Sequence, residues 1–195
     1  NHGEMLRECL ESIIQQKTNF IFEVLVGDDA STDKLTAKIV KEYESKYPST
    51  VRAFIRNKNL GPSDNYFDLI NRARGNYFAH MDGDDKMAPG KLEKQVAILD
   101  SNAEIFVASH AVEQISNGKN FVTQKERKEV EILNDWHLLT NGCFFVHSSK
   151  MYRRDKIKTW SSDVPVVDFY LHLEHAYGGK IAYDHQIFGY YRQHN

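Results

Sequence analysis

Three carboxylates lie close together near the middle of the chain, where Asp82, Asp84 and Asp85 surround Gly83. Carboxylates this close repel one another, and a bound cation removes that repulsion. Hard divalent ions such as Mg²⁺ and Mn²⁺ prefer oxygen ligands of this kind, and a glycine lets a ligand approach the backbone closely. The cluster therefore predicts a divalent-metal site, with an acidic surface turn as the alternative.

A second acidic group, Asp28 and Asp29, follows an apolar and β-branched segment over residues 20–27. Residues 77–81, directly before Asp82, are also largely apolar, so both acidic groups come at the end of a predicted buried strand. Ligands of α/β domains bind outside the carboxyl ends of the strands. Two acidic groups at that edge favour the metal interpretation, although Asp29 is also suited to capping the next helix.

Helices and strands alternate through the first half of the chain. Apolar residues at helical spacing predict helices over 4–16, 34–47, 63–73 and 89–100, and short β-branched or aromatic runs predict strands over 20–27, 51–56 and 77–81. Such alternation is typical of an α/β fold, a Rossmann-like, mostly parallel sheet flanked by helices. Because such domains usually open on a strand, we expect a short apolar strand before Asn1.

The second half is less regular. We expect a strand over 105–115, a hairpin turn at 116–118, helices over 151–157 and 167–177, and strands over 180–184 and 187–192. With no visible repeat or boundary, residues 1–195 are expected to form a single domain.

Composition excludes some function classes. The 195 residues are 41% hydrophobic and carry a formal net charge of -2, so there is no basic surface for a nucleic-acid backbone. No segment is long enough for a transmembrane helix, and no signal peptide is present. Cys9 and Cys143 match no metal or redox spacing and are expected to be buried free thiols, which is consistent with a reducing compartment.

In this order, the features resemble the family 2 glycosyltransferases, which have the GT-A fold. The resemblance is carried by six segments: N-H-G-E-M-L-R-E-C-L-E-S-I-I-Q-Q, F-E-V-L-V-G-D-D-A-S-T-D, N-K-N-L-G, H-M-D-G-D-D, V-V-D-F-Y-L-H-L and Y-Y-R-Q-H. It is closest to bacterial enzymes that build capsules, O-antigens and other surface glycans. Two features depart from the family: Ala30 replaces the glycine of its D-D-G-S, and its first strand, which lies in the middle of the sheet, is absent.

The resemblance implies an inverting transfer of a hexose or N-acetylhexosamine from a nucleoside-diphosphate sugar to a glycan or lipid-linked acceptor. A UDP-sugar is the expected donor, and Mn²⁺ or Mg²⁺ would neutralise its diphosphate as the bond to the sugar breaks. Residues 1–100 would bind the nucleotide sugar and residues 101–195 the acceptor. The enzyme would be cytoplasmic, with peripheral association at the inner face of the membrane left open.

The family motifs also imply residue roles. Metal binding is assigned to Asp84 as the direct ligand, Asp85 and His194. Substrate binding is assigned to Asp28, Asp29, Asp82, Asn59 and Arg192, of which Arg192 would pair with phosphate. A lone histidine near a chain end is often only solvated, so His194 keeps that alternative.

Asp168 is the implied catalytic base. An inverting transfer needs a carboxylate that takes the proton of the acceptor hydroxyl while its oxygen attacks the anomeric carbon. Asp168 starts a predicted helix, so an aspartate that only stabilises the first turn is the alternative. Asp163 and Glu174 are the reserve candidates.

Three other functions remain open. A sugar-nucleotide-binding protein without transfer activity would lack the base or the first strand. A nucleotidyltransferase usually has a glycine-rich N-terminal loop with basic residues, which is not visible here. A glycosidase uses paired carboxylates and needs neither the metal cluster nor a nucleobase loop.

Overall fold

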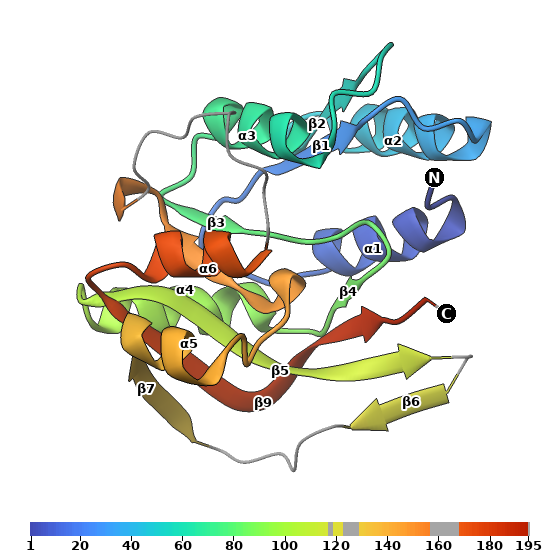
Figure 1. Ribbon diagram of the computed structural model, residues 1–195. Helices are drawn as coiled ribbons and strands as arrows, with labels where there is room; N and C mark the ends of the chain where they lie inside the picture. The colour runs from blue at the N-terminus through green and yellow to red at the C-terminus, as the bar shows by residue number, and fades with distance from the viewer. Residues whose placement is uncertain (117–118, 123–128, 157–167, 195) are drawn as a thin grey trace.

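Helices and strands alternate through the first hundred residues, and strands dominate the rest (Figure 1). The computed structural model describes residues 1–116, 119–122, 129–156 and 168–194. The first half contains α1 (Glu4–Ile14), β1 (Val24–Asp28), α2 (Lys34–Lys46), β2 (Val51–Ile55), α3 (Pro62–Arg72), β3 (Tyr77–Ala79), β4 (Lys86–Met87) and α4 (Lys91–Ser101). The second half contains β5 (Ile105–Ser116), β6 (Lys119–Val122), β7 (Val130–Asn134), α5 (Asp135–Asn141), η1 (His147–Ser149), β8 (Met151–Arg153), η2 (Arg154–Lys156), α6 (Asp168–Ala176) and β9 (Lys180–Arg192).

The strands form two sheets, a small parallel one and a larger one of mixed direction. β1 and β2 pair in parallel, and a second sheet has the order β3-β8-β5-β9-β4, with β6 on β5 and β7 on β9. Within the second sheet, β5 and β9 pair in parallel, whereas β3, β4, β6, β7 and β8 all pair antiparallel to their neighbours. The prediction of a mostly parallel sheet is therefore wrong, and the α/β class is retained.

The second half of the chain explains why the larger sheet is mixed rather than mostly parallel. Residues 151–156, predicted as helix, form strand β8 and the short 3-10 helix η2. Parallel neighbours need a long crossover, usually a helix, whereas antiparallel strands need only a short connection. The two strands expected over 180–192 are one continuous strand, β9, which follows β5 along most of its length.

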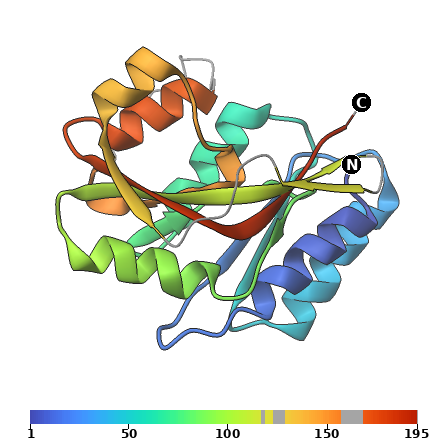
Figure 2. The ribbon, with the colours of Figure 1, turned by 90° about the horizontal axis from the view of Figure 1, so that it is seen from below.

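Helices cover both faces of the larger sheet. Figure 2 shows α4 on one side of β5 and β9, and α5 and α6 on the other. Two apolar clusters result. The first joins α1, α2, β1, β2 and α4 to the sheet, and the second packs α5 and α6 against β5, β8 and β9. No helix among the described residues is long and apolar enough to cross a bilayer.

The N-terminal helices are held by their ends. Asp33 caps α2 by accepting the backbone N–H of Thr36 at 2.7 Å, as expected for an aspartate at this position. The Thr36 hydroxyl oxygen in turn accepts the backbone N–H groups of His2 and Gly3, which begin α1. These contacts place the start of α1 beside the loop that follows β1.

The two sheets are separated by a cleft. Among the described strands, β1 pairs only with β2 and β3 pairs only with β8, so one edge of each faces the gap. A cleft of about 1560 Å³ lies there, with apolar lining from α1, β1, β3 and α4, including Leu6, Leu10, Val24, Val26, Tyr77, Ala79 and Leu92. Protein interiors are normally close-packed. The cleft therefore lies between the open edges of β1 and β3.

Candidate active site

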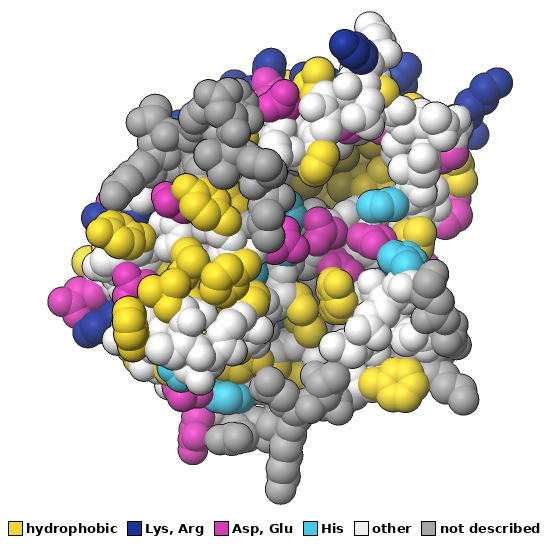
Figure 3. All heavy atoms as spheres, in the orientation of Figure 1, with side chains coloured by type: hydrophobic (Ala, Val, Ile, Leu, Met, Phe, Trp, Pro, Cys, Tyr) yellow, Lys and Arg dark blue, Asp and Glu magenta, His cyan; other side chains and the backbone are white. Residues whose placement is uncertain are grey.

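Asp82 lines one end of the cleft, and Asp84 and Asp85 follow it in the turn after β3. Acidic side chains gather there beside histidines, next to a hollow with apolar walls (Figure 3). The backbone turns so that the N–H of Asp85 donates to the carbonyl of Asp82 at 3.1 Å. Asp85 is 2% exposed; its Oδ1 accepts the backbone N–H of Arg192 at 2.8 Å. The Asp84 Oδ2 accepts a hydrogen bond from His194 Nε2 at 2.7 Å.

The surroundings of Asp85 raise the pKa of its carboxyl group. Burial, together with the negative charges of Asp82 and Asp84, raises the pKa of Asp85 to about 6. Its second oxygen, Oδ2, is buried and has no hydrogen-bond partner among the described residues. A cation in contact with this oxygen would satisfy it and favour the ionised form. The residues therefore fit a divalent ion.

The donor set also matches the chemistry of such an ion. Carboxylate oxygens with one imidazole nitrogen suit Mg²⁺ or Mn²⁺. In the part of the chain that the structure describes, no group of three His, Cys, Asp or Glu is arranged to hold a metal by itself. Mg²⁺ often binds through one or two carboxylates and takes its other ligands from phosphates and water. Asp84 and Asp85 fit that incomplete arrangement.

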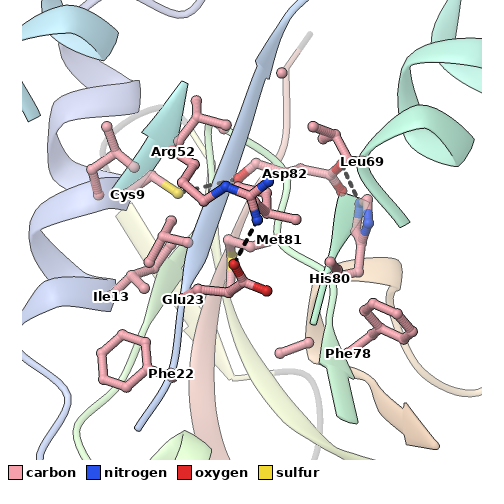
Figure 4. A pocket seen from close by; sticks show the side chains of 18 of the residues that line it. Cys9, Ile13, Phe22, Glu23, Arg52, Leu69, Phe78, His80, Met81 and Asp82 are labelled. Atoms are coloured by element: carbon pink, nitrogen blue, oxygen red, sulfur yellow. Dashed lines mark hydrogen bonds and ion pairs between the residues drawn. The ribbon is translucent and has the colours of Figure 1, made fainter. Parts of the chain in front are cut away.

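Asp82 differs from the other two acids because its carboxylate is fully hydrogen-bonded. His80 Nε2 donates to Oδ1 at 3.0 Å, and the Ser148 hydroxyl donates to Oδ2 at 3.0 Å. Burial opposes ionisation of Asp82, but these hydrogen bonds outweigh it and hold the pKa below its ordinary value. Figure 4 shows His80 on the side of the cleft opposite Cys9 and Ile13 of α1, whereas the carbonyl of Asp82 accepts a hydrogen bond from Cys9 Sγ at 3.5 Å.

The loop after β1 forms another wall of the cleft. Asp28 is 5% exposed and accepts the backbone N–H of Ser31 at 3.1 Å. The two carboxylate oxygens of Asp29 accept the backbone N–H groups of Leu60 and Gly61 at 2.7 and 2.9 Å. Asp29 therefore joins two loops, and the alternative role of capping α2 belongs to Asp33.

Two neighbours complete this wall. Asn59 Nδ2 donates to the Asp29 carbonyl at 3.2 Å, so the predicted substrate residues Asn59 and Asp29 do lie together. Ala30 has a φ of 58° and lies in the left-handed region, which favours glycine. This chain keeps the backbone shape that its motif requires, although an alanine occupies the position.

Arg192 lies near the acids, but its side chain points to α1. Its Nη2 pairs with Glu8 Oε2 at 3.0 Å, while its backbone N–H holds Asp85. The predicted contact between its guanidinium and phosphate therefore remains a prediction that requires the arginine to leave Glu8.

Asp168 begins α6, and its side chain is 71% exposed. Its Oδ1 lies 3.6 Å from Nδ1 of His147, which is almost fully buried. Glu174 lies on the same helix, and Asp163 lies outside the described residues. The exposed carboxylate is accessible to an acceptor, as a base must be.

Sequence reasoning missed several residues of the site. His147 and Ser148 contact Asp168 and Asp82, and His2 lies against Gly83, where an added Cβ would meet its ring at 2.8 Å. The dipeptide His147-Ser148 follows an apolar run, which is the same signal that identified the acidic groups. Cys143 is exposed rather than buried, and Cys9 is buried as expected.

Comparison with known proteins identifies the family. The family model described as "Glycosyl transferase family 2" matches residues 1–160. The chain belongs to glycosyltransferase family 2. It is 36% identical over 200 residues to the uncharacterized protein Rv1520 of Mycobacterium tuberculosis, covering 100% of this chain and 56% of that protein. It therefore spans about half the length of that curated relative.

Shorter matches include proteins with named activities. The chain is 39% identical over 104 residues to the putative glycosyltransferase EpsE of Bacillus subtilis, covering 52% of this chain and 36% of EpsE. It is 32% identical over 108 residues to the abequosyltransferase RfbV of Salmonella typhimurium, covering 55% of this chain and 32% of RfbV.

Solved structures show that this chain has the GT-A fold. S. aureus TarS in complex with UDP superposes with a TM-score of 0.76 at 22% identity, covering 96% of this chain and 56% of TarS. GalNAc-T7 with UDP, GalNAc and Mn²⁺ gives a TM-score of 0.70 at 14% identity, covering 97% of this chain and 41% of that protein.

The stability of this glycosyltransferase is expected to rise with pH because two lysines are buried. Burial lowers the pKa of Lys91 and that of Lys150 to about 7, from an ordinary value of 10.5. Between these pH values the unfolded chain binds more protons than the folded chain, so the free energy of unfolding increases with pH, by up to ~1.4 kcal/mol per pH unit for each lysine. Denaturant unfolding from pH 7 to 9 should show this slope.

Lys91→Met is the control for that measurement. Methionine keeps the volume but does not titrate, so the variant should lose up to half of the slope. A slope unchanged by the substitution would contradict the assignment of Lys91 as a neutral buried amine at high pH.

Proposed function

We propose that this chain catalyses an inverting, metal-dependent transfer of a hexose or N-acetylhexosamine from a nucleoside-diphosphate sugar, with a UDP-sugar as donor. The observation that carries the proposal is the unsatisfied buried oxygen of Asp85, beside Asp84, at the end of a cleft walled by the Asp28–Asp29 loop. Further support comes from TarS, whose structures include complexes with UDP and UDP-GlcNAc, and from GalNAc-T7, which was solved with UDP and Mn²⁺.

In this proposal, the donor binds at the end of the cleft where β1 and β3 end. Asp84, Asp85 and His194 hold Mn²⁺ or Mg²⁺, which neutralises the charge of the diphosphate leaving group. Asp82 faces the cleft, with its side chain 44% exposed, and accepts a ribose hydroxyl. Asp28 and the Asp29–Asn59 pair surround the nucleobase end of the cleft.

The acceptor binds to the second half of the chain, residues 101–195. Asp168 accepts the proton of the acceptor hydroxyl as that oxygen attacks the anomeric carbon, and its exposure leaves it free to do so. RfbV, EpsE and the amylovoran biosynthesis glycosyltransferase AmsE of Erwinia amylovora support a glycan or lipid-linked acceptor in the synthesis of a bacterial surface polysaccharide.

The proposed donor site is tested by calorimetric titration of UDP, GDP and dTDP in Mn²⁺ and in EDTA. We expect UDP to bind in Mn²⁺ and to show no measurable binding in EDTA, because the acids repel a diphosphate when no cation lies between them. The GDP and dTDP titrations report the preference for the base. Failure of the folded protein to bind any of the three nucleotides would overturn the proposal.

A further inference from the structure

We propose that the adjacent residues His147 and Ser148 are positioning residues that set Asp168 and Asp82 relative to each other. The inference rests on the proposed function, in which Asp82 binds the donor and Asp168 is the base. Both residues belong to η1, a single 3-10 turn that lies between the two acids. A turn of this kind would fix the distance from the base to the donor.

Ser148 connects the turn to the donor side. Its hydroxyl donates to Asp82 Oδ2 at 3.0 Å and accepts the backbone N–H of Asp82 at 3.0 Å. This reciprocal pair fixes both the carboxylate and the backbone of Asp82. Ser148 is 5% exposed, so water does not compete for these bonds.

His147 connects the same turn to Asp168. Its Nδ1 lies 3.6 Å from Asp168 Oδ1 and 3.4 Å from Nε2 of His172. Cys143 Sγ donates to the carbonyl of Phe145, so it accepts from Nδ1 of His172 at 3.0 Å. Nε2 of His172 is then an acceptor, which makes Nδ1 of His147 the donor. That N–H donates to His172, and Asp168 Oδ1 lies in contact with the same nitrogen, at 3.6 Å.

The position of His147 is fixed by its surroundings. Its ring centroid lies 3.8 Å from that of His80, in an edge-to-face contact, and His80 itself donates to Asp82. Burial holds the pKa of His147 well below its usual value, so the ring is neutral and donates through one nitrogen only. His147 therefore contacts both acids, one directly and one through His80.

The backbone of the turn is held as well. Lys91 Nζ donates to the carbonyl of Ser148, and Ser149 Oγ donates to the carbonyl of Val146 at 2.8 Å. Ser109, a fully buried serine on β5, lies outside the turn and is a matched control for Ser148.

The inference predicts that substitutions at the two neighbouring positions change different kinetic parameters, KM at Ser148 and kcat at His147. The reaction measured is the Mn²⁺-dependent release of GlcNAc from UDP-GlcNAc, in which water replaces the acceptor. Ser148→Ala should raise KM and the Kd for UDP by about 10-fold with little change in kcat, because it loosens a donor-binding carboxylate. His147→Leu should lower kcat by about 100-fold at unchanged KM, because it misplaces the base.

Controls separate positioning from folding. His147→Asn keeps an N–H close to the position of Nδ1 and should restore most of kcat. Ser109→Ala and His110→Leu remove a buried hydroxyl and a buried imidazole from β5, outside the turn, and both should leave kcat and KM unchanged. The inference would be overturned if Ser148→Ala and His147→Leu changed kcat and KM in the same way, or if His147→Asn did not restore kcat.

A second measurement does not depend on turnover. Nitrogen-15 NMR of the His147 ring should show the neutral form with its proton on Nδ1, and Asp168→Asn should shift this signal. No shift would overturn the contact with Asp168. The proposed function has a separate test, because it is overturned if UDP does not bind in Mn²⁺. If Asp168→Asn loses activity while His147→Leu has no effect, only the present inference is overturned.

Discussion

Asp84→Ala is expected to weaken Mn²⁺-dependent binding of UDP by about 100-fold or more, the largest loss of affinity that we expect from a single substitution. A carboxylate that binds the metal directly should matter at least as much as the residues that orient such ligands, whose loss costs about 10- to 100-fold. The hydrogen bond that Asp84 accepts comes from His194, and Asp84 does not belong to the apolar core. The variant should therefore fold.

The measurement is calorimetric titration of UDP in Mn²⁺, with thermal unfolding to confirm the fold. Asp64→Ala is the control, since Asp64 is also acidic but is exposed in the first turn of α3. It should bind UDP as the unchanged protein does. Equal affinity in Asp84→Ala and Asp64→Ala would remove Asp84 from the metal site.

Asp168→Asn is expected to lower kcat by about 10²- to 10⁴-fold while UDP affinity stays the same. Asparagine keeps the shape of the side chain but cannot accept the proton of the attacking hydroxyl at neutral pH. Since the side chain is 71% exposed, the substitution leaves no buried group unsatisfied, and the stability should change little. Steady-state kinetics with UDP-GlcNAc, together with UDP titration, measure both quantities.

Glu174→Gln is the matched variant, because Glu174 lies on the same helix and is the reserve candidate for the base. We expect its kcat to change less than threefold, since general-base catalysis is lost only with the reacting carboxylate. A large loss of kcat in Glu174→Gln with full activity in Asp168→Asn would transfer the role of base to Glu174.

Local patterns predicted the elements that hold the donor site. In α1, Leu6, Cys9, Leu10 and Ile13 are buried as their spacing indicates. Both acidic groups do come at the ends of strands, β1 and β3. These features depend on a few consecutive residues, where helical periodicity and capping chemistry act directly.

Local patterns could not predict contacts between distant parts of the chain. Ser148 and Asp82 are 66 residues apart, and nothing local indicates that they pair. Residues 151–153 were predicted as helix but pair with β3 and β5, and that pairing decides their conformation. The guanidinium of Arg192 was placed at the diphosphate by its motif, whereas Glu8, which is 184 residues away, holds it at α1.

The open cleft between β1 and β3 has a consequence for behaviour in solution. Among the described residues, each of these strands has an edge that pairs with no other strand, and such edges readily pair with strands of other molecules. The apolar walls between them would strengthen that pairing. These two edges would therefore promote self-association of the chain at high concentration.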